Sequence, residues 1–277
     1  YCGGSIMKKN KIYFWLKVAL TIVSGILAIL LKCRINWPDA LNIVDFFINH
    51  LALKEFIYDI SIGVFSAMIL VWFIDEIAKH IEEQKTQKAE KETILRLNRV
   101  LEKYLSKYER CFYCVITPVS DRCSSDVLIS KDFSLKDMRD LFQPSLLPNY
   151  GLSESSISSF LQIELDLRHE LTRIIERNSF VYYPRFVEIL SKYIEISLEY
   201  DCRTSILEAQ SKQMGGRKMI EVINEYLSKD ADKYKDLLLE GKGSASNIMF
   251  PYVLLNILMH KERKILDEYK EEIQNIL

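Results

Sequence analysis

Glycine and proline are scarce in this chain, which has nine and six of them among 277 residues. Because β architectures need many turns built from these residues, their scarcity argues against a turn-rich β fold and favours helices. An excess of charge is also lacking, since 37 basic and 38 acidic residues leave a net charge of −1. This balance argues against a nucleic-acid footprint spread over the chain, and we expect no nucleic-acid partner.

A disulfide pattern is absent as well. The six cysteines have no regular spacing, which is typical of thiols in a reducing compartment. The best metal candidate is the pair Cys111 and Cys114, with Cys123 and Cys202 as further ligands. A structural zinc site usually joins two such pairs, and only one is present here. We therefore expect ordinary buried thiols, no metal site and no cofactor.

Long hydrophobic runs occur only near the start, at Ile12–Leu31 and Phe56–Ile74. Each carries one charge, Lys17 in the first and Asp59 in the second. A helix needs about 20 apolar residues to cross a bilayer, and each run is close to that length. The pattern predicts a transmembrane hairpin whose external loop is 33–55, with the lipid bilayer as a partner.

The first run is predicted to be an uncleaved signal anchor. No small-x-small cleavage site follows it, and a lysine precedes Cys33, where a lipoprotein signal needs a small residue. Lysines are denser before the first run and after the second than in the loop between them. We expect a two-pass protein of a bacterial inner membrane, with hairpin 12–74, N-terminal segment 1–11 and both termini in the cytoplasm. Met7 begins a lysine-rich bacterial start, so residues 1–6 are interpreted as an extension of the reading frame.

The charges inside the two runs have a structural interpretation. Lys17 lies about one and a half helical turns from the cytoplasmic end, where its side chain can snorkel and meet Asp75 or Glu76 on the returning helix. Asp59 lies near the outer end of the second run. The alternative is an ion pathway, which intramembrane charges often mark.

Small residues recur at a spacing of four in both runs, as Ser24 with Ala28 and as Gly63 with Ala67. Such pairs allow membrane helices to approach closely. They predict packing within the hairpin or, as the alternative, a seam between copies of the chain.

The segment 75–93 is charged on every face and contains no helix breaker, so we expect a solvated helical stalk. An apolar seam follows, and its spacing of three and four covers less than the three heptads that a coiled coil requires. We expect it to pack inside a soluble domain, 94–277, with an intermolecular coiled coil as the alternative. The seam consists of Ile94, Leu97, Leu101, Tyr104, Tyr108 and Cys111.

The soluble domain is predicted to be an all-α bundle of about five to seven helices. Residues 116–152 contain three prolines and a serine cluster, and predict a long loop on the domain surface with one short helix at Leu135–Leu141. Gly215 and Gly216 mark a break between helices. The remaining expected helices are Ser153–Arg177, one opening at Pro184 and continuing to Tyr200, Lys218–Leu227, Asp232–Glu240 and one from Ser244–Asn247 to Leu277.

No motif supports an enzyme, and we name no catalytic residue. His169 and Glu170 resemble half of a metalloprotease helix, but Arg173 stands where the second histidine is required. We expect Arg168, Arg173 and Arg177 to form a solvated face that pairs with Glu164, Glu170 and Glu176 on the same helix. The segment 241–244 lacks the preceding glycine and strand of a phosphate loop and is expected to be a connector.

Three classes of function remain. The first is a membrane-anchored cytoplasmic interaction, scaffold or sensor module that binds an unknown protein or small ligand through its soluble domain. The second is a membrane effector that assembles into a homo-oligomer and forms a pore or perturbs the membrane. Its architecture is similar to that of some phage-defence effectors, although no motif carries the resemblance. The third is an enzyme with an unrecognised helical active site.

Overall fold

The computed structural model is mostly helical, which confirms the prediction of an all-α protein. The chain divides into two compact units, Tyr1–Thr86 and Gln87–Leu277. The residues that the structure describes are 17–29, 51–122, 132–144, 154–229, 233, 235–236 and 247–277.

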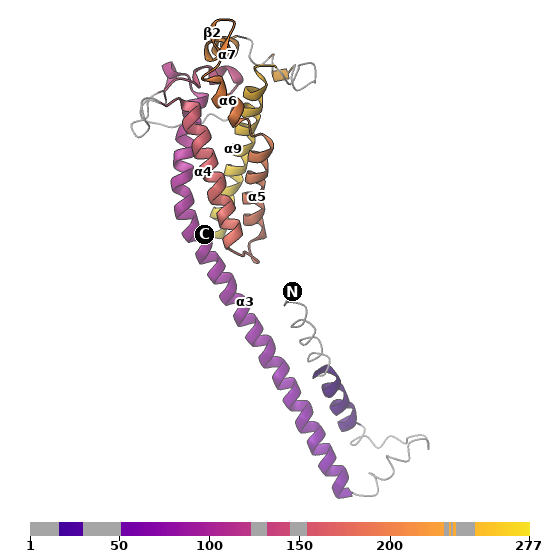
Figure 1. Ribbon diagram of the computed structural model, residues 1–277. Coiled ribbons are helices and arrows are strands. Elements are labelled where there is room, and N and C mark those ends of the chain that lie inside the picture. Colours follow the sequence, from indigo (N-terminus) through magenta and orange to yellow (C-terminus); the bar gives the residue numbers. More distant parts are fainter. Residues whose placement is uncertain are drawn as a thin grey trace. The chain divides into compact units, whose positions relative to one another are not determined.

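Helix α3 (Leu51–Ile116) belongs to both units and extends over 66 residues (Figure 1). No glycine or proline follows Gly63 within it, so nothing interrupts the helix before Pro118 stops it. In the described part of the chain, α3 is the one helix long and apolar enough to cross a membrane, and its most apolar window is only 6% buried.

The first unit also contains a shorter apolar helix, Lys17–Ile29. It covers the middle of the first hydrophobic run. The remaining residues of that run, and the predicted external loop up to residue 50, lie outside the described residues.

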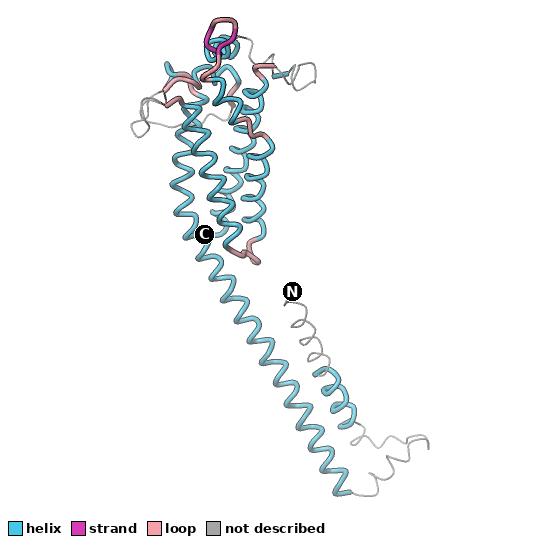
Figure 2. Tube along the Cα trace, in the orientation of Figure 1, coloured by secondary structure: helices cyan, strands magenta, loops and turns pink. Residues whose placement is uncertain are grey.

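The second unit is a helical bundle. Its long helices are the last part of α3, α4 (Ser156–Arg177), α5 (Pro184–Glu199) and α9 (Phe250–Ile276), with α5 packed against both α4 and α9 (Figure 1). Among the described residues, two short strands form one small hairpin (Figure 2). The short elements are the 3₁₀ helices η1 (Val119–Asp121) and η2 (Leu135–Asp140), α6 (Arg203–Ala209), β1 (Gln213–Met214), β2 (Arg217–Lys218) and α7 (Met219–Ser228).

Several helix ends lie where the sequence predicts them. Pro184 and Pro251 occupy the first turns of α5 and α9, where a missing N–H costs nothing. Gly215 and Gly216 have φ values of 60° and 79° and form the two-residue turn of the hairpin, a conformation that glycine adopts without strain. The cap of α4 is Ser155. The expected cap Ser153, most of the expected helix 232–240 and the connector 241–244 lie outside the described residues.

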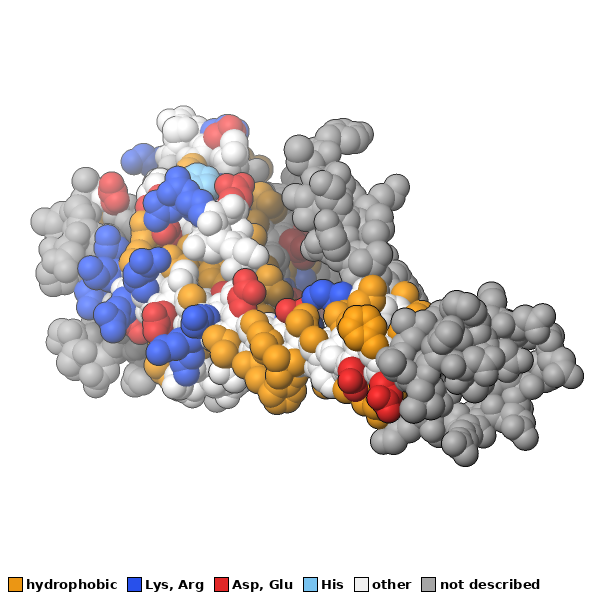
Figure 3. Space-filling model, turned by 90° about the horizontal axis from the view of Figure 1, so that it is seen from below, with side chains coloured by type: hydrophobic (Ala, Val, Ile, Leu, Met, Phe, Trp, Pro, Cys, Tyr) orange, Lys and Arg blue, Asp and Glu red, His pale blue; other side chains and the backbone are white. Residues whose placement is uncertain are grey.

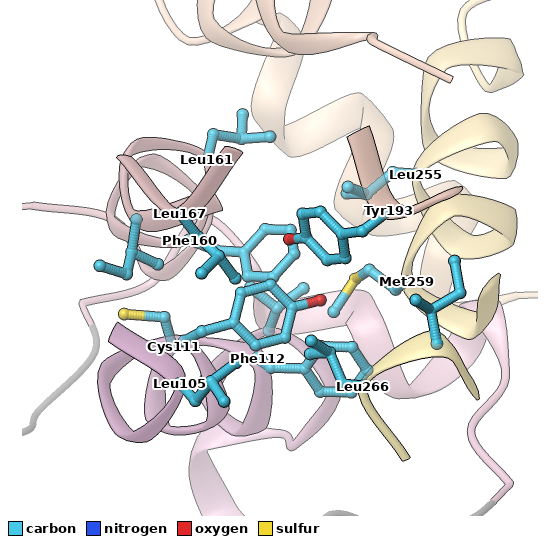
Figure 4. Packing of buried hydrophobic residues seen from close by; sticks show 14 of the residues in the cluster. Leu105, Cys111, Phe112, Phe160, Leu161, Leu167, Tyr193, Leu255, Met259 and Leu266 are labelled. Carbon is cyan, nitrogen blue, oxygen red and sulfur yellow. The ribbon is translucent and has the colours of Figure 1, made fainter. Parts of the chain in front are cut away.

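The apolar seam of α3 is part of the domain core, as predicted. Ile94, Leu101, Tyr108 and Cys111 are each at most 1% exposed. They belong to one cluster with side chains of α4, α5 and α9. Figure 4 shows this packing from close by, with labelled residues from each of the four long helices.

The prediction of a surface loop over 116–152 is wrong for residues that the structure describes there. Leu135, Met138 and Leu141 are fully buried, and Phe133 is 7% exposed. The spacing of three between these first three residues matches the period of a 3₁₀ helix, so η2 turns one apolar face inward. The short helix predicted at Leu135–Leu141 is therefore present as η2, and the prediction is wrong only in placing it on the surface.

The prediction of a stalk that is solvated on every face is wrong near its end. Glu90 is only 8% exposed. Its carboxylate accepts hydrogen bonds from the backbone N–H groups of Val181 at 3.1 Å and Tyr182 at 2.9 Å, in the connection between α4 and α5. The partner of this charge is therefore backbone from a distant segment, which spacing along a helix does not reveal.

Candidate functional site

A cluster of polar side chains lies inside the bundle and is the strongest site candidate in the second unit. Its members come from every long helix, from the connection between α5 and α6, and from the start of α6. We call it the buried polar cluster: Tyr108, Glu164, Arg168, Tyr193, Ser197, Asp201, Arg203 and Glu262.

Glu164 is the centre of the ionic part of this cluster. One oxygen accepts a hydrogen bond from the Ser197 hydroxyl, and the other lies 2.5 Å from a guanidinium nitrogen of Arg203. Arg168 donates to the Ser197 hydroxyl at 3.2 Å and lies 3.3 Å from a carboxylate oxygen of Asp201. Two guanidinium groups thus balance two carboxylates within one network.

The prediction of a solvated arginine face on α4 is wrong at Arg168. This side chain and Glu164 are 8% and 2% exposed, and their partners come from α5 and α6 rather than from the same helix. Arg173 does pair with Glu170 within α4, as predicted, and Arg177 is exposed. Spacing alone does not distinguish a buried pair from an exposed one.

Glu262 is a third carboxyl in the cluster, and it is fully buried. One of its oxygens accepts a hydrogen bond from the Tyr108 hydroxyl at 2.6 Å. Its other oxygen and the Tyr193 hydroxyl have no hydrogen-bond partner among the described residues. Burial raises the pKa of Glu262 well above 4.5, and the nearby carboxylate of Glu164 raises it further. Burial therefore favours the neutral form of Glu262.

The same burial acts on the other acids around it. Burial raises the pKa of Glu164, although Ser197 and Arg203 oppose the shift. The pKa values of Tyr108 and Tyr193 are raised by burial and by the Glu262 carboxyl. Acidic side chains with shifted pKa values occur in catalytic sites and also in structural networks. Because Glu262 itself has no exposed surface, the structural interpretation fits this carboxyl better.

The described thiols do not form a metal site. Cys111, Cys114 and Cys202 are buried and form no disulfide, and no group of three or more His, Cys, Asp or Glu residues suited to a metal ion occurs among the described residues. Cys123 lies outside them. Burial raises the pKa of Cys114, and raises that of Cys202 to about 12. These thiols stay protonated at neutral pH and are poor nucleophiles.

One surface groove lies between α3 and α9 and has a volume of about 290 Å³. Tyr108 and Phe112 line it together with charged residues of α9. Lys270 lies 2.5 Å from Glu109, so cation and anion already neutralise each other there. The volume is at the lower limit of ligand pockets, and nothing about the groove selects one ligand class.

In the first unit, Lys17 and Asp75 form an ion pair with 2.5 Å between Nζ and Oδ2, as the sequence predicts. Glu76, the other predicted partner, is exposed. Asp59 is also exposed and forms no hydrogen bond or ion pair with a described residue. Lys17 and Asp59 therefore have different surroundings, although each is the single charge of its apolar run.

The two pairs of small residues also differ. Ser24 and Ala28 are 7% and 8% exposed and pack within the unit. Between them, a Cβ added to Gly25 would lie 3.0 Å from the Phe65 ring. Gly63, by contrast, is exposed and has no atom within 4 Å of such a Cβ.

No family model matches this chain, and no curated protein and no solved structure matches it. The fold is that of a mostly helical protein in which one helix of the described residues is long and apolar enough to cross a membrane.

Proposed function

We propose that this chain is a two-pass membrane protein whose helical domain binds a protein or a small ligand on the cytoplasmic side. One observation carries the proposal. The apolar part of α3 is exposed along its length, and the same helix continues without a break into the core of the domain.

The exposed part of α3 is suited to lipid rather than to water. Phe56, Leu70 and Phe73 are 61%, 60% and 66% exposed. Figure 3 views the molecule from the end where α3 begins and shows hydrophobic side chains gathered on the surface there. A soluble monomer rarely exposes so large an apolar surface, and a bilayer removes the cost.

Helix Lys17–Ile29 supports a second crossing. It packs on α3 through Gly25 and Phe65, and its residue Lys17 meets Asp75 where the apolar part of α3 ends. A hairpin spanning 12–74 places these two charges at one membrane surface. The lysines that follow on α3 favour the cytoplasmic side for that surface.

Binding rather than chemistry is the activity proposed for the domain. The hydrogen bonds and ion pairs of its buried polar cluster join α4 to α5 and α6, and a further hydrogen bond joins α3 to α9. A partner that shifts one helix of such a set also strains the others in that set. This gives the domain the rigidity of a scaffold and a means of responding to a bound partner.

Two measurements on the full chain test the proposal. We expect it to stay in the membrane pellet after alkaline carbonate extraction. We also expect a fluorescent protein fused after Leu277 to be bright and alkaline phosphatase fused there to be inactive. Release by carbonate would refute the membrane anchor. Phosphatase activity would refute the cytoplasmic assignment and, with it, the reducing surroundings proposed for the thiols.

A second candidate is a membrane effector that assembles and permeabilises the membrane. The exposed Gly63, with open space beside it, favours this candidate because a second helix can approach closely there. Induced expression is then expected to depolarise cells, and Gly63→Leu is expected to prevent depolarisation. Unchanged membrane potential on expression of the unmodified chain at full level would exclude this candidate.

A further inference from the structure

The solvent-facing side of α3 in the second unit carries a row of basic residues. All of them are exposed, and their spacing of three, four, four and three places them within about 80° of the helix circumference. We call this row the basic stripe: Arg96, Arg99, Lys103, Lys107 and Arg110. Lys103 lies about 200° around the helix from the buried Leu101, so the stripe is opposite to the face that packs into the core.

The basic stripe has no counter-charges of its own. None of its side chains forms a hydrogen bond or an ion pair with a described residue. Two nearby acids of α3 have other partners, since Glu102 accepts a hydrogen bond from Asn98 at 2.8 Å and Glu109 lies 2.5 Å from Lys270. Glu92, one turn before the stripe, is exposed and forms no ion pair with it. Like charges three and four residues apart lower the stability of a helix, so helix stability does not account for the stripe.

Acidic side chains border the stripe on both sides. Lys107 and Arg110 line a surface groove of about 320 Å³ beside α4, which neighbours α3 in the bundle (Figure 1), and Glu154 and Asp166 line the same groove. On the side toward α9, Glu109 lines the other groove described above. The positive surface is therefore a single narrow row and not a broad basic patch.

We propose that the basic stripe binds an acidic segment of a partner protein, in the form of a helix with one carboxylate per turn. This deepens the binding function proposed above and rests on it for the cytoplasmic location of the partner. A helix with carboxylates three and four residues apart has the same axial period as the stripe, so the two rows of charge can pair along their whole length. Three of the five basic residues are arginines, whose guanidinium groups bind carboxylates through two parallel hydrogen bonds.

The acidic borders of the stripe favour this partner over other anions. A nucleic-acid duplex carries about one negative charge per 1.7 Å on two strands, and an anionic bilayer presents a plane of charge. Either would bring negative charge against the acids beside the stripe, where like charges repel. A single row of carboxylates on a helix meets the stripe alone.

Fluorescence anisotropy with a synthetic peptide tests the proposal. The probe is an alanine-based helix with glutamates spaced three, four, four and three residues apart, and the control peptide has the same composition with its glutamates spread around the helix. Each is added to the full chain in neutral detergent. We expect the probe to bind at least fivefold more tightly than the control peptide. Its binding is expected to weaken at least tenfold between about 0.1 M and about 1 M salt, because the screening length falls from about 10 Å to about 3 Å.

Charge reversal of the stripe is compared with the same change elsewhere on the domain. The stripe variant combines Arg99→Glu, Lys103→Glu and Lys107→Glu. The matched control reverses three other exposed bases that form no ion pair with a described residue: Lys136→Glu, Arg177→Glu and Lys218→Glu. We expect the stripe variant to bind the probe at least tenfold more weakly and the control variant to stay within twofold of the parent. Glutamine at the same three stripe positions is expected to weaken binding at least threefold, and it tests the stripe without adding acids that could disturb the fold.

Equal loss of binding in the two charge-reversed variants would overturn the proposal, because net charge alone would then explain it. Equal binding of the two peptides would overturn it too, as would tighter binding of an RNA duplex or of short-chain phosphatidylserine than of the probe at the same salt. Binding in detergent does not depend on the membrane anchor, so the two failures are distinguishable. A chain that resists carbonate extraction but does not bind the probe refutes the stripe alone, and a chain that is extracted but binds the probe refutes the anchor alone.

Discussion

Lys17 and Asp75 form an ion pair across 58 residues of sequence, with 2.5 Å between the ammonium nitrogen and a carboxylate oxygen. The pair joins the helix Lys17–Ile29 to α3 at the end of its apolar part. In the proposed hairpin it neutralises the charge of Lys17, which otherwise borders hydrocarbon.

Charge reversal tests this pair. Lys17→Asp places two carboxylates together and is expected to lower the amount of chain inserted in membranes severalfold. Adding Asp75→Lys restores the pair and is expected to restore insertion, measured by immunoblot of carbonate-washed membranes. Adding Glu76→Lys instead is the matched control, since it inserts the same charge one residue away. Equal rescue by both would contradict a specific pair.

Glu90 joins α3 to the connection between α4 and α5 through the N–H groups of Val181 and Tyr182. Hydrogen bonds to a charged acceptor contribute about 1.5–3 kcal/mol each, so Glu90→Ala is expected to destabilise the domain by about 2 kcal/mol or more. Hydrogen exchange of these two amides, measured on the detergent-solubilised chain, is expected to accelerate at least tenfold. Glu92→Ala, at an exposed position two residues away, is expected to leave the exchange rates of both amides unchanged. Unchanged exchange in Glu90→Ala would argue against this link.

The buried Glu262 predicts how stability depends on pH. Its pKa is raised in the folded state and returns to about its usual 4.5 on unfolding, so its contribution is fully present below pH 4.5 and is lost as pH rises toward the folded pKa. For one such group the loss approaches about 1.4 kcal/mol per pH unit. Glu262→Gln stays neutral, and it is expected to be more stable than the parent at pH 8 and to flatten the pH profile.

Denaturant unfolding of the full chain in detergent between pH 5 and pH 8 measures this effect. Glu225→Gln is the control, because the pKa of the exposed Glu225 is lowered by Lys229 and Arg217, and no gain at pH 8 is expected from its removal. A Glu262→Gln variant with an unchanged pH profile would show that Glu262 is not the buried neutral acid described above.

Truncation of a buried side chain in the 3₁₀ helix η2 is expected to lower the stability of the domain strongly, although the region around η2 has little regular structure. Met138 is fully buried, and its sulfur accepts a hydrogen bond from the buried amide of Asn256 at 3.6 Å. Met138→Ala is expected to cost about 2–5 kcal/mol of unfolding free energy, as for other large-to-small changes in a core. Lys136→Ala, exposed on the same helix, is expected to change it by less than about 0.5 kcal/mol. Similar effects of the two substitutions would mean that η2 does not belong to the core.

Much of the fold could be predicted because it depends on local pattern. Helix period, scarce glycine and the prolines in the first turns of α5 and α9 predict an all-α chain with those two helix starts. Hydrophobic length identifies the apolar part of α3. The Lys17–Asp75 pair could also be predicted, because antiparallel packing of two apolar helices would bring charges at matching positions together.

The candidate site could not be predicted in the same way. Arg168 and Glu164 are four residues apart on α4, a spacing that is typical of an exposed ion pair, yet both are buried. Arg168 pairs with Ser197, which is 29 residues further along the chain, and Glu164 pairs with Arg203, which is 39 residues further along. Burial of a charge depends on which helices pack around it, and no local pattern carries that information.

The amino-acid sequence thus determines the helices, the apolar lengths and the positions of most breaks, because each depends on neighbours within a few residues. Only the tertiary structure decided which polar groups are enclosed: Glu90 by distant backbone, Glu262 by Tyr108, and Ser61 but not Ser66 by a neighbouring helix. The reason is physical. The free energy of a charge or a small side chain depends on its surroundings, and packing brings those surroundings from distant parts of the chain.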